Sequence, residues 1–158
     1  MIKYRQFKKQ DARGVYNVAL EGWKYAYKAI FDYKYIQKFI NDYYSPKRLI
    51  SILSHIESGK IFFYVALDKS KVIGFANFGD KGQGWELFRI YLNPKYIGKG
   101  IGKELIKLGE KFLKEKNADK YFCFVHKDNK IGIKFYIKNG FRHINKKDKE
   151  DEFYMEKS

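Results

Sequence analysis

This sequence predicts a single α/β (α+β) domain, with a central mixed, mostly antiparallel sheet flanked by helices. Three observations lead to this prediction. Helical spacing of apolar residues in the first part of the chain gives way to β-rich runs in the middle. A glycine-rich turn then separates a strand from an amphipathic helix. A strand–helix–strand unit over residues 85–126 requires two parallel neighbours, because parallel strands need a crossover connection.

The N-terminal part is predicted to hold one strand and three helices. Residues 2–7 alternate weakly, as in a strand. Asp11 can cap a helix that continues to about residue 29, and Gly22 suggests a bend within it. A second helix follows from i, i+3, i+4 and i+7 spacing between Ile36 and Tyr43. A third begins at the Ser45-Pro46 cap and is ended by Gly59.

The remaining elements are mainly strands. Turns at residues 68–71 and 80–84 are predicted to join three consecutive strands into a meander. The elements expected after residue 60, in chain order, are strands 61–67, 72–78 and 85–92, a helix from the glycine turn to about residue 116, a strand at 121–126, a short helix capped by Asp128 or Asn129, and strands 141–144 and 153–156.

The composition is that of one folded domain covering residues 1–158. Apolar residues make up 45% of the chain, and no Pro- or Ser-rich linker divides it. The one cysteine, Cys123, excludes an internal disulfide and is expected to pack in a buried strand. No signal peptide is visible, and no apolar run approaches the ~20 residues of a membrane span. We therefore expect a cytoplasmic protein with no membrane partner.

The formal net charge of +15 favours an anionic partner, such as nucleic acid, a membrane surface or a phosphorylated cofactor. The lysines are scattered over helices and loops, however, which indicates a solvated surface for most of them. Nucleic-acid binding remains open, but no motif supports it. Three dispersed histidines and one cysteine have no metal-ligand spacing, so no metal is expected.

The stretch from residue 93 to 105, N-P-K-Y-I-G-K-G-I-G-K-E-L, predicts an anion-binding turn. A glycine-rich turn that opens a helix can point several backbone N–H groups at one anion, and the helix adds partial positive charge. Gly98, Gly100 and Gly102 let the backbone approach a phosphate without a Cβ clash. The alternative is a glycine-rich loop with no ligand.

The element order and two motifs resemble the GCN5-related N-acetyltransferase (GNAT) superfamily over nearly the whole chain. The family's Q/R-x-x-G-x-G/A motif matches residues 97–102 with both glycines present, but Ile97 stands where Gln or Arg is usual. This departure removes a side-chain contact to the pyrophosphate, for which Lys99 and Lys103 can partly compensate. A downstream signature, N-x5-F-Y-x2-N-G-F, matches residues 129–141.

This resemblance implies the GNAT fold, with an acetyl-CoA cleft at a parallel strand pair. It implies acetyl transfer from acetyl-CoA to a primary amine by direct attack in a ternary complex. The strand backbone at residues 90–92 would pair with the pantetheine arm, and an N–H near Tyr91 would stabilise the oxyanion. The cofactor-binding residues implied are Ile90, Tyr91, Leu92, Ile97, Gly98, Lys99, Gly100, Ile101, Gly102, Lys103, Asn129 and Tyr136.

Glu86 and Tyr136 are the catalytic candidates. Alkyl ammonium groups titrate near ~10, so the site must remove a proton before an amine can attack. Glu86 matches the catalytic glutamate of the histone-acetylating branch and would act directly or through water; the alternative is an exposed carboxylate or a substrate anchor. Tyr136 would donate a proton or hydrogen bond to the leaving thiolate; the alternative is a core ring. His126 is a second candidate base, unless it is simply solvated.

Residues 22–27 and 43–45 resemble the PaiA-like branch, which acetylates polyamines and related small amines. Core packing is the alternative for the aromatic residues in them. A polycation would need a local acidic pocket in so basic a chain, with candidates Glu21, Asp32, Asp42 and Glu86. The substrate-binding residues expected are Trp23, Tyr25, Tyr27, Tyr44, Glu86 and His126.

Two other functions stay open at this point. The first is a protein N-terminal or lysine acetyltransferase, which would need an open groove. The second is a non-catalytic acetyl-CoA- or nucleic-acid-binding module, which would lack a reachable carboxylate. An enclosed aromatic and acidic pocket would favour a small polyamine. The sequence is compatible with a homodimer and determines neither the acceptor amine nor the oligomeric state.

Overall fold

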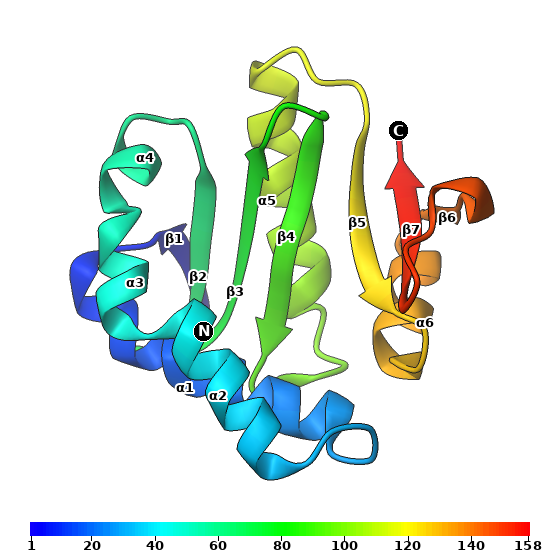
Figure 1. The fold of residues 1–158 in the computed structure, drawn as a ribbon. Coiled ribbons are helices and arrows are strands. Elements are labelled where there is room, and N and C mark those ends of the chain that lie inside the picture. Colours follow the sequence, from blue (N-terminus) through cyan, green and yellow to red (C-terminus); the bar gives the residue numbers. More distant parts are fainter.

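The computed structural model describes residues 1–158 and places seven strands in one sheet, in the order β1-β2-β3-β4-β5-β7-β6 (Figure 1). All neighbouring strands are antiparallel except β4 and β5, which are parallel. The predicted mixed sheet and its parallel pair are therefore confirmed. The strands are β1 (Ile2–Gln6), β2 (Phe62–Asp68), β3 (Lys71–Asp80), β4 (Trp85–Leu92), β5 (Tyr121–His126), β6 (Arg142–His143) and β7 (Glu152–Lys157).

Helices cover both faces of the sheet. They are α1 (Ala12–Tyr27), α2 (Tyr33–Tyr44), α3 (Pro46–Ser51), α4 (Leu53–Glu57), α5 (Ile101–Glu115) and α6 (Lys130–Lys138). Helices α1 to α4 cover what we call the α1 face, and α5 and α6 cover the opposite α5 face (Figure 1). Each face has its own apolar core. None of the helices combines the length and the apolarity needed to cross a bilayer.

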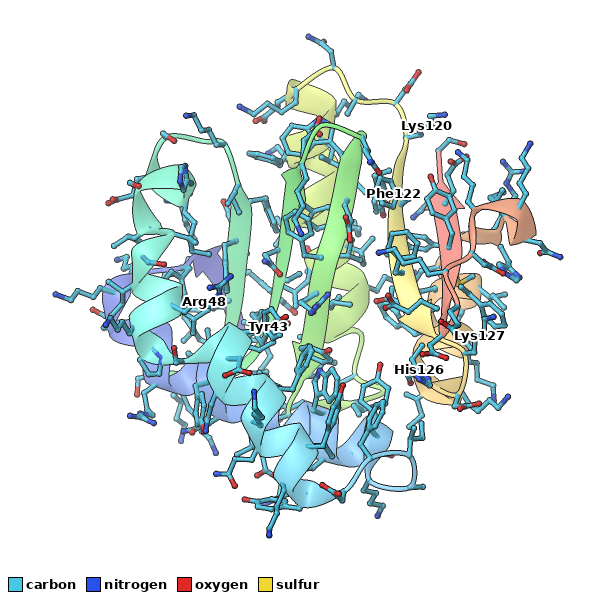
Figure 2. The ribbon with its side chains drawn as sticks, in the orientation of Figure 1. Tyr43, Arg48, Lys120, Phe122, His126 and Lys127 are labelled. Atoms are coloured by element: carbon cyan, nitrogen blue, oxygen red, sulfur yellow. The ribbon has the colours of Figure 1, made fainter.

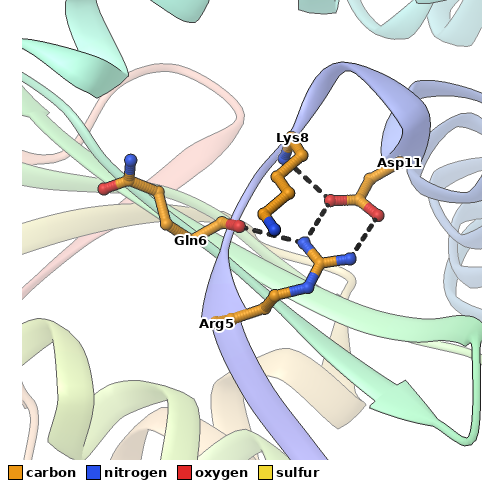
Figure 3. A network of polar contacts seen from close by, with 4 residues as sticks. All are labelled: Arg5, Gln6, Lys8 and Asp11. Atoms are coloured by element: carbon orange, nitrogen blue, oxygen red, sulfur yellow. Dashed lines mark hydrogen bonds and ion pairs between the residues drawn. The ribbon is translucent and has the colours of Figure 1, made fainter.

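Arg5 and Asp11 determine how the chain enters α1 (Figure 3). The sequence predicts Asp11 as the N-cap of this helix, but its side chain accepts no hydrogen bond from α1. The carboxylate instead accepts the Lys8 N–H at 2.8 Å and two guanidinium N–H groups of Arg5 at 2.7 and 3.0 Å. Asp11 therefore occupies the predicted N-cap position, but its side chain ties the end of β1 to the 3-10 turn that precedes α1 and does not cap the helix.

The other helices follow the sequence prediction with two differences. Helix α1 continues through Gly22, where a bend was predicted. A Cβ at Gly22 would lie 3.3 Å from the Tyr91 ring, so this glycine permits close contact with β4. The third predicted helix, over residues 46–59, is broken at Ile52 into α3 and α4. The Ser45 side chain caps α3, as predicted.

Strands β4 and β5 meet at one point and then separate. Glu86 is paired with Phe122, and no further pair follows toward the C-terminal ends of the strands, which diverge in Figure 1. The register between β3 and β4 also shifts by one residue at Phe88, which is a β-bulge. A bulge bends its strand and changes the direction of the next side chains. The separation and the bulge together open the sheet beside the second half of β4.

Candidate active site

A cavity of about 900 Å³ occupies the opening between β4 and β5. On the α1 face its wall comes from α1, the α1–α2 loop, α2 and the start of β7. On the α5 face its wall comes from the glycine turn, the start of α5, and α6. The cavity therefore passes through the sheet, so two molecules that enter from opposite faces can meet between the two strands.

The glycine turn forms one end of the cavity. Gly98 has φ +84° and Gly100 has φ +81°, values that an L-residue rarely adopts, and no atom lies within 4 Å of a Cβ placed at either. Gly100 is the N-cap of α5. The free N–H groups of the first helical turn and the positive end of the helix dipole therefore face open space. Ile97, Gly98 and Gly102 line the cavity. This geometry fits a pyrophosphate group.

Gly102 and the two lysines of the turn contribute in other ways. A Cβ on Gly102 would lie 2.9 Å from the Phe135 ring, so glycine here lets α5 pack closely against α6. Lys99 lies over the Tyr96 ring, 5.3 Å from its centroid, and Lys103 is exposed. Neither lysine makes an ion pair, which leaves both charges available to an anion at the turn.

Two backbone amides of β4 face the opening. The Asn93 N–H donates to the Ile73 carbonyl of β3 at 2.8 Å. Hydrogen-bonded pairs recur at every second residue of an antiparallel ladder, so the Tyr91 N–H is also directed to β3. The N–H groups of Ile90 and Leu92 therefore point to the opposite side, toward β5. Because β4 and β5 have separated at this level, β5 does not bind these two groups. These two amides are the ones free to pair with an extended ligand.

Tyr136 lies in the cavity wall on α6, with 9% of its surface exposed. Burial raises the pKa of its hydroxyl well above the ordinary value, and Cys123 raises this pKa further. The hydroxyl is therefore protonated at neutral pH and can act as a hydrogen-bond donor, and in this structure it lies beside the Cys123 thiol. Burial also raises the pKa of the Cys123 thiol, which is a neutral packing group as its sequence context suggests.

Asn129 makes two bonds that shape the cavity. Its Oδ1 accepts the Gly132 N–H at 2.9 Å, so Asn129 and not Asp128 caps α6. Its Nδ2 donates to the Tyr27 hydroxyl at 3.1 Å, which ties α6 to α1. Asn129 lines the cavity, but both polar atoms of its side chain are already engaged. Its structural role is therefore evident without a ligand.

His126 stands at the end of β5, near the loop that joins α1 and α2 (Figure 2). Its ring meets those of Tyr27 and Phe31 edge-on, with centroids 5.9 and 5.5 Å apart. Its Nδ1 accepts the Asp128 N–H at 3.1 Å, which leaves the proton of the neutral ring on Nε2. In this tautomer His126 is better suited to donate a hydrogen bond than to remove a proton.

Glu86 is half-buried and does not line the cavity. Burial raises the pKa of its carboxyl and the charge of Glu152 raises it further, whereas Lys81 and Lys149 lower it. The role of Glu86 as a base stays a prediction.

Three of the four aromatic residues predicted to bind substrate line the cavity, namely Trp23, Tyr25 and Tyr27. Trp23 donates a hydrogen bond to the Tyr91 hydroxyl, which holds α1 against β4. Tyr44 is not in the wall. It is 5% exposed and lies behind Tyr91, with the two ring centroids 6.2 Å apart. Tyr44 therefore supports the wall from the α1-face core.

The carboxylates of the cavity differ from those that the sequence suggested. None of Glu21, Asp32, Asp42 and Glu86 lines the wall. The acidic residues that do are Asp128, Asp151 and Glu152. The sequence alone carries no signal for the last two, because β7 becomes the neighbour of β5 only through the strand order. Their presence corrects the predicted acidic pocket.

Arg89 and several further aromatic residues complete the wall. Arg89 shares the α1 face with Tyr91, and strand alternation back from Tyr91 could have identified it. No group of three or more His, Cys, Asp or Glu side chains is arranged to hold a metal ion. The aromatic residues that were not singled out from the sequence are Phe31, Tyr35, Phe39, Phe88, Phe124 and Phe135.

Comparisons with known proteins agree with this architecture. A family model described as the acetyltransferase (GNAT) family matches residues 23–141. A curated relative, the spermidine N(1)-acetyltransferase of Thermoplasma acidophilum, is 36% identical over 157 residues, which cover 99% of this chain and 96% of the relative.

Solved structures give the same result. The PaiA N-acetyltransferase of Thermoplasma acidophilum, solved in complex with coenzyme A, is 34% identical, with a TM-score of 0.94 over 100% of this chain and 99% of that one. A GNAT-family acetyltransferase of Staphylococcus aureus Mu50 is 18% identical, with a TM-score of 0.78 over 99% and 98% of the two chains. This second match shows the shared fold alone.

Proposed function

This chain belongs to the acetyltransferase (GNAT) family and is an acetyl-CoA-dependent N-acetyltransferase, and we propose that the amine it acetylates is a polyamine. The observation that carries the proposal is the cavity that crosses the sheet. Its cofactor side consists of the glycine turn, the β4 edge and α6. Its acceptor side, on the α1 face, combines aromatic rings with carboxylates. The relative that is named a spermidine N(1)-acetyltransferase supports this assignment.

Acetyl-CoA supplies an acetyl group activated as a thioester. On the cofactor side, the N–H groups at the start of α5 would bind its pyrophosphate, and the Ile90 and Leu92 amides would bind its extended arm. Tyr136 would donate a hydrogen bond to the sulfur. Because burial raises the pKa of Tyr136, hydrogen-bond donation is favoured over complete proton transfer to a thiolate.

On the acceptor side, the amine must lose a proton before it attacks. Glu86 is the proposed base and acts through water, since its side chain stands back from the cavity. Its raised pKa keeps the carboxylate a stronger base than an ordinary glutamate. The amide of Ile90 is the proposed donor to the negative charge that develops on the acetyl oxygen. Attack is direct, with both substrates bound in a ternary complex.

The distribution of charge accommodates a cationic acceptor in a basic protein. The +15 net charge is spread over the surface and favours capture of the anionic cofactor. Asp128, Asp151 and Glu152 line the cavity, and Glu152 shares the α1 face with His126. The local field is therefore more favourable to a cation than the net charge suggests.

The test is a substrate panel with acetyl-CoA, in which release of free thiol is followed over time. Spermidine, spermine and putrescine are compared with amino acids, aminoglycosides and peptides that expose an N-terminus or a lysine. We expect kcat/KM to be highest for a polyamine. A peptide preferred over every polyamine would reject the assignment in favour of protein acetylation. Intersecting initial-velocity lines are expected for a ternary complex, whereas parallel lines would contradict direct attack.

A further inference from the structure

The cavity contains one half-buried carboxylate without an ion-pair partner, that of Glu152. This side chain lines the cavity and is half-buried. It forms no ion pair, although eight other pairs occur in the structure. Its side chain makes no hydrogen bond, and its backbone carbonyl accepts the Lys149 N–H at 2.9 Å. A half-buried charge that lacks a counterion favours binding of a cation.

The cations of this region are directed elsewhere. The Lys149 ammonium lies over the Phe124 ring, 3.9 Å from its centroid. Lys127 lies over the Phe153 ring at 5.7 Å. The Arg89 guanidinium donates to the Phe88 carbonyl at 2.6 Å. None of the three comes within ion-pair distance of Glu152. Arg89 is the nearest in effect, because burial alone would lower the pKa of its guanidinium and the Glu152 charge helps to raise it, but the two groups do not touch and the carboxylate remains accessible to a ligand.

Aromatic rings surround the approach to this carboxylate. Glu152 is paired with His126 across the β5–β7 ladder, so both side chains lie on the α1 face. His126 in turn contacts Tyr27 and Phe31, and Phe31 stacks on Tyr35 at 4.6 Å. Ring faces attract ammonium groups, and the attraction is stronger where water is excluded.

We infer that Glu152 binds the ammonium group of the acceptor that is not acetylated. The inference rests on the proposed polyamine function and names the residue that selects for it. One end of a polyamine must be neutral at the β4–β5 opening, while its other nitrogen atoms remain protonated and need a counterion. β7 lies one strand beyond β5, which places Glu152 on the order of 5–10 Å from the opening. Asp151, exposed beside it, can receive a further ammonium.

The experiment uses two substrates of equal length, 1,8-diaminooctane and octylamine, together with spermidine. The diamine and spermidine carry a second ammonium group, whereas octylamine carries only one. For Glu152→Gln we expect kcat/KM to fall about 10- to 100-fold with spermidine and the diamine, and less than about twofold with octylamine. Glu152→Asp, which keeps the charge, should recover part of the loss. Glu150→Gln removes the same charge from the exposed turn nearby and should leave kcat/KM unchanged for all three amines.

Several outcomes would overturn the inference. If Glu152→Gln retains the wild-type preference for the diamine over octylamine, Glu152 is not the ammonium site, even though the polyamine function stands. If it slows all three amines equally, Glu152 acts in the chemistry or the fold. Calorimetric titration with coenzyme A distinguishes a folding defect, because unchanged affinity shows an intact cofactor side. If the wild-type enzyme itself prefers octylamine, both the polyamine function and the role of Glu152 are rejected.

Discussion

Tyr136 is the residue at which a sequence motif and the cavity coincide. Tyr136→Phe removes the hydroxyl and keeps the ring, so we expect kcat to fall about 10- to 100-fold while coenzyme A affinity changes less than about threefold. Steady-state kinetics and calorimetry measure the two quantities. Tyr16→Phe is a matched control, since that hydroxyl bonds to Asn41 outside the cavity. Normal turnover in Tyr136→Phe would remove this residue from the mechanism.

If Glu86 is the base, the rate should depend on the protonation state of its carboxyl group. Its carboxyl pKa is raised by burial, so the basic form appears at higher pH than for an ordinary glutamate and is present from there upward. Between that pKa and the amine pKa near ~10, the wild-type enzyme can use the base. Glu86→Gln must rely on the small neutral fraction of the amine.

We therefore expect the loss in Glu86→Gln to be about 100-fold near neutrality and to shrink as the pH approaches ~10. The measurement is a kcat/KM profile from pH 6 to 10. Glu115→Gln, an exposed change on α5, serves as the control. An identical profile in wild type and Glu86→Gln would exclude Glu86 as the base.

Residues in local motifs could be predicted from sequence, and residues brought in by the tertiary structure could not. Gly98, Gly100 and Tyr136 belong to short patterns whose conformations depend on nearby residues. Glu152 reaches the cavity only because β7 lies beside β5, in register with His126. A single sequence does not determine this pairing. For the same reason, the acidic residues suggested from the sequence do not line the cavity.

The turn between β4 and α5 is the element on which cofactor binding depends. Gly100→Asp forces an L-residue to φ +81° and adds negative charge at the helix N-terminus. We expect coenzyme A affinity to fall at least about 100-fold by calorimetry. Gly82→Asp imposes a similar strain and the same charge in the open β3–β4 turn, where φ is +103°. Equal affinity losses in both variants would contradict the placement of the pyrophosphate.

The connection from β1 into α1 is an element whose importance is structural. Asp11 is 4% exposed and accepts from both Arg5 and the Lys8 backbone. Asp11→Ala should lower the free energy of unfolding by about 1–3 kcal/mol in urea titrations, because the partly buried Lys8 N–H and the Arg5 guanidinium lose their acceptor. Asp42→Ala is the control. It breaks an exposed ion pair with Lys38 and should change the free energy of unfolding by less than about 0.5 kcal/mol. Equal effects would contradict this account of Asp11.

Element boundaries were predictable where a local cap or turn determines them, as at Ser45 and the hairpin turns. Two errors have a tertiary cause. Asp11 is drawn away from its expected capping role by Arg5 on β1. Gly22 serves contact with Tyr91 and not a bend. The break at Ile52 has no signal in the apolar spacing, which continues across it.

At the scale of the whole molecule, the order of strands and helices determined the sheet and its one parallel pair. The crossover over residues 85–126 requires that pair on topological grounds alone. The separation of β4 from β5, beside the bulge at Phe88, has no signal in the order of elements. That separation is what lets a cofactor on one face meet an amine on the other.

The most direct test is a crystal structure of the protein with coenzyme A bound. We predict density for the pyrophosphate at the N–H groups of residues 98–103, with the arm along Ile90 and Leu92 and the sulfur beside the Tyr136 hydroxyl. Density for coenzyme A elsewhere on the molecule, with the turn and the β4–β5 opening empty, would contradict the account.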